Sequence, residues 1–154
     1  MADDLKLDAI FNLRYAMRVL ERNASFWRKV AALLKVLSLL SGSVALASML
    51  TDKPKVAVWL ALLFAIAQSL EYALSPFEKA LLSEVQRKRY AKVWATSAQS
   101  DASTLANAYT SLVSEDDISP FRSLRELAYD DVVSEQGLDP TSCYGGNCLM
   151  RLLS

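Results

Sequence analysis

Residues 30–50 read VAALLKVLSLLSGSVALASML and residues 56–74 read VAVWLALLFAIAQSLEYAL. Each segment carries one charged side chain, Lys35 in the first and Glu71 in the second. An α-helix needs ~20 mostly apolar residues to cross a bilayer, so both segments are long enough. The five residues between them contain Pro54 and leave room only for a turn, so the helices run antiparallel. We therefore expect an all-α membrane protein with a two-span antiparallel transmembrane helical hairpin and cytoplasmic helices on both its N- and C-terminal sides.

A soluble pair of antiparallel helices inside a larger core is the alternative to this hairpin. Soluble helices normally carry several charges on the face that meets water. Here each segment has a single charge, and a chain of 154 residues offers little other apolar surface to cover both helices. The composition also favours the membrane, because 53% of the residues are hydrophobic and only 22% are charged.

Basic residues flanking the hairpin predict its orientation, because the cytoplasmic flanks of spans are enriched in Lys and Arg. Five lie within residues 14–29, before the first span, and five follow the second, whereas the turn holds only Lys53 and Lys55. The flanking residues are Arg14, Arg18, Arg22, Arg28, Lys29, Lys79, Arg87, Lys88, Arg89 and Lys92. We expect both termini in the cytoplasm.

The composition argues against an enzyme. The chain has no His, which removes Ser-His-Asp triads and imidazole metal ligands. Its two cysteines, Cys143 and Cys148, are too few for a metal site, and we expect a turn with two reduced thiols. The remaining residues offer no set of nucleophile and base, so we expect no catalytic residue, no metal and no cofactor.

Polar and small residues recur along one face of each span. At 100° per residue they occupy a narrow sector of the first helix, opposite large apolar residues such as Leu33 and Leu40. In the second span, Ala57, Ala61 and Ala65 form a small-xxx-small series, which permits close approach of helices. The candidate pore-lining residues are Lys35, Ser38, Ser41, Ala45, Ser48, Gln68 and Glu71.

The short turn predicts which residues lie at equal depth. In an antiparallel hairpin that turns at residues 51–55, the numbers of two such residues sum to about 106. Lys35 and Glu71 meet this condition, as do Ser38 and Gln68. An unpaired charge in hydrocarbon costs ~2.5–3.5 kcal/mol, which favours a Lys35–Glu71 pair within one hairpin or between subunits.

The polar faces have two interpretations. They line a water-filled pore, or they serve helix packing while Lys35 extends to the cytoplasmic surface. One hairpin cannot enclose a channel, so a pore requires a homo-oligomer, for which we expect a tetramer or a slightly larger ring.

The rest of the chain divides into residues 1–29, 75–98 and 99–154. We expect an amphipathic helix from Asp3 or Asp4 to about Asn23, and a post-membrane helix from Pro76 to about Ser97, with Ser75 as its N-cap. In the tail we expect one helix from about Asp101 to Val113. A second helix should follow Ser119-Pro120-Phe121 and end before Gly137.

Charge is unevenly distributed. Residues 1–100 contain 14 Lys and Arg against 8 Asp and Glu, and residues 101–154 contain 3 against 9. The basic faces are therefore expected to bind an anionic signal or the acidic tail. The alternatives are that these faces are solvated, or that they only set the orientation of the hairpin in the membrane. The candidate ligand-binding residues on these faces are Arg14, Arg18, Arg22, Arg87, Lys88 and Arg89.

Residues 8–98 resemble the SLATT family of small two-span effectors in prokaryotic defence. The resemblance lies in Arg14, Arg18, Arg22, Trp27 and Arg28 before the first span, and in the 76–90 helix after the second. It implies a pore-forming effector in a bacterial inner membrane that depolarises the cell during phage infection. It also implies a nucleotide or oligonucleotide signal, made by a nucleotidyltransferase partner, that opens or closes the pore. The competing hypothesis is a small membrane adaptor that scaffolds a cytoplasmic partner and conducts nothing.

Overall fold

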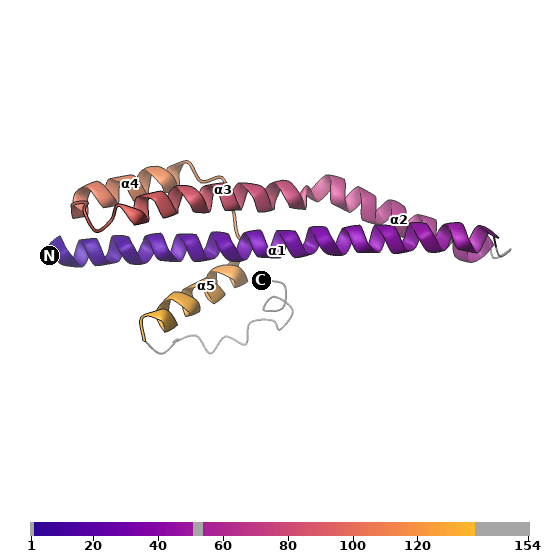
Figure 1. Cartoon of the computed structure of the whole chain (residues 1–154), viewed down its shortest axis with the longest axis horizontal. Coiled ribbons are helices and arrows are strands. Elements are labelled where there is room, and N and C mark those ends of the chain that lie inside the picture. The colour runs from indigo at the N-terminus through magenta and orange to yellow at the C-terminus, as the bar shows by residue number, and fades with distance from the viewer. Residues whose placement is uncertain (1, 51–53, 138–154) are drawn as a thin grey trace. The chain divides into compact units, whose positions relative to one another are not determined.

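The computed structural model describes residues 2–50 and 54–137; for residues 2, 3, 45, 48–50 and 54 it describes the backbone alone. All regular secondary structure in these ranges is helical, which confirms the all-α prediction for them (Figure 1). The helices are α1 (Ala2–Leu50), α2 (Pro54–Leu74), α3 (Pro76–Ala95), α4 (Ala102–Ser114) and α5 (Arg122–Glu135). The predicted turn at Cys143 and Cys148 lies outside the described residues.

The chain forms two compact units. Residues 2–26 pack with the described residues 80–137, and we call this unit the bundle. Trp27–Lys79 form the second unit, which we call the hairpin. The described parts of the segments 1–29, 75–98 and 99–154, apart from residues 27–29 and 75–79, thus belong to one bundle.

α1 does not end near Asn23, so that prediction was wrong: the helix continues to Leu50. Residues 24–41 contain neither Gly nor Pro, and no residue there interrupts the backbone hydrogen bonds of a helix.

The predicted break at Ser75 is confirmed, because α2 ends at Leu74 and α3 begins at Pro76. Proline disfavours the helical conformation in the residue before it, and Ser75 has a φ of 41°. The Ser75 hydroxyl donates to the Tyr72 carbonyl oxygen at 3.2 Å, so it serves the end of α2 instead of capping α3.

The bundle has a core on one face of α1 and a second contact on another. Toward α3 and α4 the core consists of Ala9, Leu13, Leu20, Tyr90 and Leu105. α5 lies along a different side of α1 in Figure 1 and buries Leu124, Leu127, Ala128, Val132 and Val133. Edge-on contacts of Tyr129 with Phe11 and Tyr15 tie α5 to α1.

The Tyr90 phenol should make the bundle sensitive to alkali. Burial, and then the Asp116 carboxylate 3.5 Å from its oxygen, raise the pKa of Tyr90 above the 10.0 of a free phenol. Since the folded pKa is the higher one, the stability linked to this proton is complete below about pH 10 and is lost as the pH rises above it. We expect the melting temperature to fall above pH 10, and to fall less in Tyr90→Phe. Thermal unfolding followed by circular dichroism tests this, with Tyr129→Phe as an exposed control; equal slopes in all three proteins would contradict it.

The hairpin packs along a seam with a period of three and four residues. On α1 the buried seam residues are Trp27, Ala31, Leu34, Ser38 and Ser41. On α2 Ala57 and Ala67 are buried. This alternation is the heptad spacing of antiparallel helices that supercoil about each other. Small residues at most of these positions let the two backbones approach closely.

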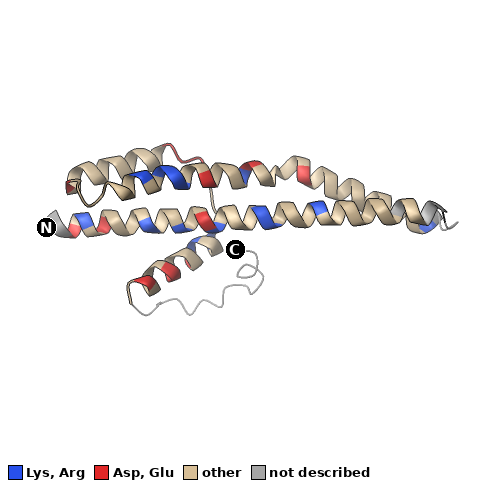
Figure 2. Cartoon of the chain, viewed as in Figure 1, with Lys and Arg blue, Asp and Glu red and all other residues tan. Residues whose placement is uncertain are grey.

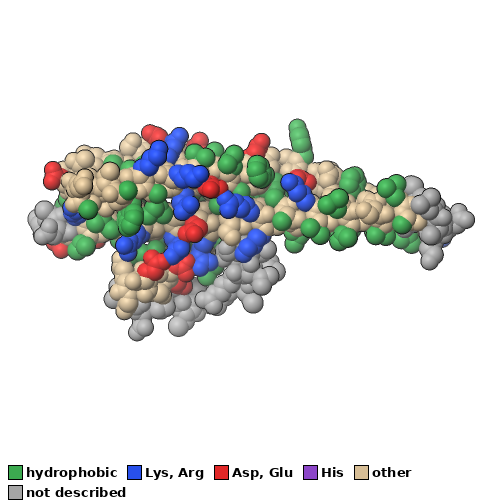
Figure 3. Space-filling model, viewed as in Figure 1, with side chains coloured by type: hydrophobic (Ala, Val, Ile, Leu, Met, Phe, Trp, Pro, Cys, Tyr) green, Lys and Arg blue, Asp and Glu red, His purple; other side chains and the backbone are tan. Residues whose placement is uncertain are grey.

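The outer surface of the hairpin is apolar. Leu39, Leu46, Val58 and Trp59 are each at least 66% exposed. In Figure 3 the visible face of this unit carries many hydrophobic and few charged side chains. Within the described residues one helical stretch, Lys55–Ala95, is long and apolar enough to cross a membrane, and only 11% of its apolar window is buried. One candidate span thus supports the prediction that the chain is a membrane protein.

Candidate functional site

A groove of about 460 Å³ runs along the hairpin between α1 and α2. Its lining combines charged, amide and hydroxyl groups with apolar ones, in a surface that is otherwise mainly apolar. The lining residues are Lys35, Ser38, Leu39, Gly42, Ser43, Leu46, Phe64, Gln68 and Glu71.

Two contacts across the groove follow the register predicted from the turn. The Gln68 amide donates to the Ser38 hydroxyl. A Cβ added at Gly42 would meet the Phe64 ring at 3.6 Å, so the glycine allows this ring to lie close to α1. The numbers of Gly42 and Phe64 also sum to 106, as those of Ser38 and Gln68 do, so this second contact follows the same register. The prediction that Ser38 and Gln68 lie level is confirmed.

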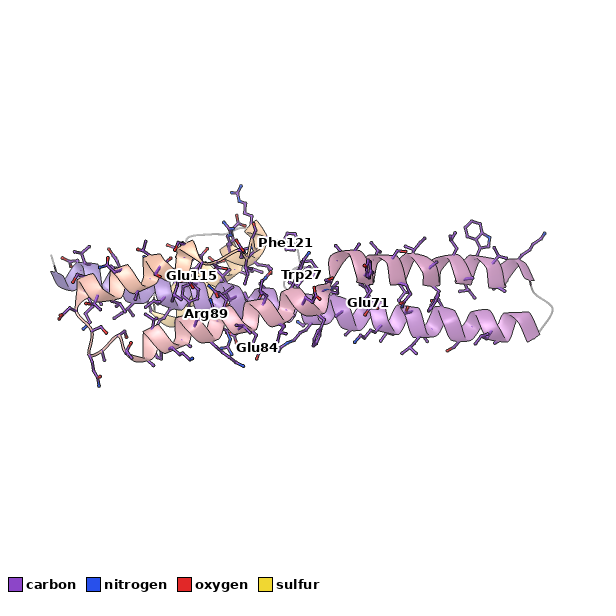
Figure 4. The ribbon with its side chains drawn as sticks, turned by 90° about the horizontal axis from the view of Figure 1, so that it is seen from above. Trp27, Glu71, Glu84, Arg89, Glu115 and Phe121 are labelled. Atoms are coloured by element: carbon purple, nitrogen blue, oxygen red, sulfur yellow. The ribbon has the colours of Figure 1, made fainter. Side chains whose placement is uncertain are left out.

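Lys35 and Glu71 lie at the same level of the groove without touching. Both line it, and Lys35 is exposed whereas Glu71 is half-buried. Among the described residues neither forms an ion pair, so the expected pairing within one hairpin is not formed. Figure 4 labels Glu71 on α2. Two opposite charges thus share one groove and are both available to another molecule.

Ser38 and Ser41 face α2 instead of an open surface. They are 6% and 3% exposed, and the Ser41 hydroxyl donates to the Leu37 carbonyl oxygen at 2.7 Å. In a single chain, Ser41 therefore serves helix packing, which was the alternative interpretation, whereas Ser38 packs against α2 and also lines the groove. The side chains of Ala45 and Ser48 lie outside the described residues.

The alanine series of α2 does not form the contact with α1. Ala61 and Ala65 are exposed, and the Tyr72 side chain is 89% exposed. Residues four apart drift around a helix, whereas the heptad seam alternates three and four and so stays on one face. The small-xxx-small interpretation was wrong for this pair of helices beyond Ala57.

Two of the three arginines on the basic face of α1, Arg18 and Arg22, are paired with acidic residues of α5. Arg22 holds Asp131 through two hydrogen bonds, Nε to Oδ2 at 2.7 Å and Nη2 to Oδ1 at 2.9 Å. Arg18 pairs with Glu135, and this hydrogen bond raises the pKa of Arg18. Figure 2 shows the acidic residues along α5 beside the basic residues of α1. For Arg18 and Arg22 the structure thus provides the acidic-tail partner that the sequence left open.

The basic residues of α3 differ from one another. Arg89 lies 3.3 Å from Glu115 at the end of α4, a pair labelled in Figure 4. Lys88 is exposed and lies 3.7 Å from Glu84, one turn earlier on α3. Arg87 is half-buried and has no ion-pair partner within the described ranges.

Sequence reasoning missed several residues of these sites. Leu39, Ser43 and Leu46 line the groove but fall outside the stripe drawn at 100° per residue, and Phe64 lies among the stripe residues of the second span but was not named as pore-lining. The fourfold spacing of Arg18 and Arg22 matches that of Asp131 and Glu135, a signal that could have predicted pairing of α1 with α5.

No protein-family model, curated protein or solved structure matches this chain, so the SLATT resemblance stays a prediction.

Proposed function

We propose that this chain is a two-span membrane protein that assembles into a homo-oligomeric ion pore with both termini in the cytoplasm. Residues 30–50 and 56–74 form the spans. The observation that supports the proposal most directly is the groove, which places Lys35 and Glu71 unpaired in an apolar surface.

The apolar surface argues for a bilayer around the hairpin. Soluble monomers rarely expose contiguous apolar patches beyond ~300–600 Å². The exposed Leu, Val, Ile and Trp side chains of α2 and of the second half of α1 continue around the hairpin. Lipid chains cover such a surface without loss of hydrogen bonds, because all backbone polar groups of a helix are satisfied within it.

The groove argues for several copies. A charge exposed to hydrocarbon costs ~2.5–3.5 kcal/mol, so Lys35 and Glu71 require water or an opposite charge. A ring of hairpins with the grooves turned inward supplies both, since Lys35 of one copy meets Glu71 of the next at the same level around a hydrated lumen. We propose a tetramer or a slightly larger ring.

The lumen narrows toward the turn in this arrangement. From the level of the charges toward the turn, the groove is lined by Gln68, then by Phe64, and then by Ser43 and Leu46. Apolar constrictions can close a pore by excluding water. The bundle acts as the cytoplasmic regulator, and the resemblance extends the proposal to an antiphage effector that depolarises the membrane in response to a nucleotide signal.

Ion flux in proteoliposomes tests conduction. We expect the wild-type chain to dissipate a potassium diffusion potential, and Ser43→Leu to slow the flux at least ~tenfold because an added apolar ring dewets the lumen. Ser41→Ala is the matched control. Because Ser41 is buried against α2, this variant should retain the flux of the wild type. An intact wild-type oligomer without flux would contradict the pore and favour the non-conducting adaptor, which the packing role of Ser38 and Ser41 also fits.

A further inference from the structure

The bundle contains a second hollow, separate from the groove of the hairpin. It has a volume of about 310 Å³ and lies among α1, α3 and α5. Three guanidinium groups, two carboxylates and one indole line it together with apolar side chains. The lining residues are Arg14, Met17, Arg18, Glu21, Arg87, Trp94, Val132 and Glu135.

Among the described residues, two of the three guanidinium groups have no carboxylate partner. Arg18 is paired with Glu21 and Glu135, the two carboxylates of the lining. Arg14 and Arg87 are half-buried, and in the described part of the chain no carboxylate lies within ion-pair distance of either. The Arg14 guanidinium carbon lies 5.6 Å from the centre of the Trp94 ring, a contact that orients the cation without neutralising it.

We propose that this hollow binds a phosphate-bearing anion between Arg14 and Arg87. The planar guanidinium group donates two parallel hydrogen bonds to phosphate oxygens, and such charged bonds are stronger than neutral ones. Partial burial strengthens them further by lowering the local dielectric. The volume is at the lower end of the ~300–1,000 Å³ of small-molecule sites, which suits a phosphate ester or a diphosphate.

Binding of this anion competes with α5 for Arg18. Glu135 lines the same hollow and is paired with Arg18, so an incoming phosphate competes with the Glu135 carboxylate for the Arg18 guanidinium group. The anion binds more tightly when Glu135 is displaced, and this differential affinity loosens the end of α5. The site thereby couples an anion to the position of α5. This site stands whether or not the hairpin conducts ions.

Calorimetric titration of the full chain with inorganic pyrophosphate, in nanodiscs of zwitterionic lipid, tests the site. We expect saturable binding that weakens at least ~tenfold in Arg14→Gln and in Arg87→Gln, because each loses a charged hydrogen bond. Lys88→Gln is the matched control, since Lys88 follows Arg87 on α3 but is exposed and outside the hollow. Glu135→Gln should tighten binding, a gain that misfolding cannot mimic.

A second arm identifies the source of the phosphate. Nanodiscs that contain phosphatidic acid are examined by hydrogen exchange of α5 in the absence of soluble phosphate. Faster exchange of α5 that requires Arg87 would assign the site to a lipid headgroup, and faster exchange with pyrophosphate alone would assign it to a free phosphate. The proposal is overturned if neither probe acts on the wild type, or if Lys88→Gln weakens binding as much as Arg87→Gln.

Discussion

Replacing Glu71 by Lys should dissociate the homo-oligomer. In the proposed ring Glu71 of one copy meets Lys35 of the next, and the substitution places two like charges at that level. Like charges that face each other across an interface cost several kcal/mol, so we expect association to weaken at least about a hundredfold per contact. Mass photometry in mild detergent measures the result, with the wild type as a ring and the Glu71→Lys variant as a monomer.

The charge-exchanged double variant provides the control. Lys35→Glu combined with Glu71→Lys restores one charge of each sign and should restore the ring, while Glu71→Gln, which leaves Lys35 unpaired, should weaken it less than Glu71→Lys. Membrane insertion of all three is compared by their yield in the membrane fraction. An oligomer of Glu71→Lys as stable as the wild type would show that Glu71 lies outside the subunit contact.

The register of the hairpin could be predicted from the turn alone. A short connection fixes the antiparallel alignment, because each residue toward the turn on one helix has one counterpart on the other. The contacts of Ser38 with Gln68 and of Gly42 with Phe64 follow this rule. So does the Lys79 ammonium, 4.5 Å from the centre of the Trp27 ring. Helix starts at Pro76 and after Asp101 were equally predictable from their local sequence signals.

The face that each helix presents could not be predicted in the same way. Drawing the stripe at 100° per residue treats α1 as a straight isolated helix, whereas helices that pack over many turns follow a period of 3.5. Ser38 and Ser41 therefore lie in the seam. Ser43, which the predicted stripe did not include, lines the groove. Hydroxyl groups suit both packing and water, so their chemistry alone does not distinguish the two environments.

The docking site of the acidic tail could not be predicted from the sequence either. Its negative charge indicated a basic partner, but the sequence did not say which of the two basic faces it meets. The structure places α5 on Arg18 and Arg22, since its buried face of Leu124, Leu127 and Ala128 requires an apolar neighbour as well as charges. Hydrophobic burial thus decides where α5 docks, and the ion pairs fix its alignment.

The position of the two termini relative to the turn is the most direct test of the membrane hairpin. Single cysteines at three places report it in a Cys148→Ser background: Asp4→Cys near the N-terminus, Thr51→Cys in the turn and the native Cys143 in the tail, with Cys143→Ser added for the first two. A membrane-impermeant maleimide is applied to intact cells and then to permeabilised cells. In intact cells the maleimide labels a cysteine on the outer side and leaves a cysteine on the cytoplasmic side unlabelled.

Two spans predict that the impermeant maleimide labels only the Thr51→Cys variant in intact cells, and all three cysteines after permeabilisation. A single span formed by α2 would leave the N-terminus and the turn on the same side, so Asp4→Cys and Thr51→Cys would be labelled together or protected together. That result, or labelling of Cys143 in intact cells, would contradict the hairpin.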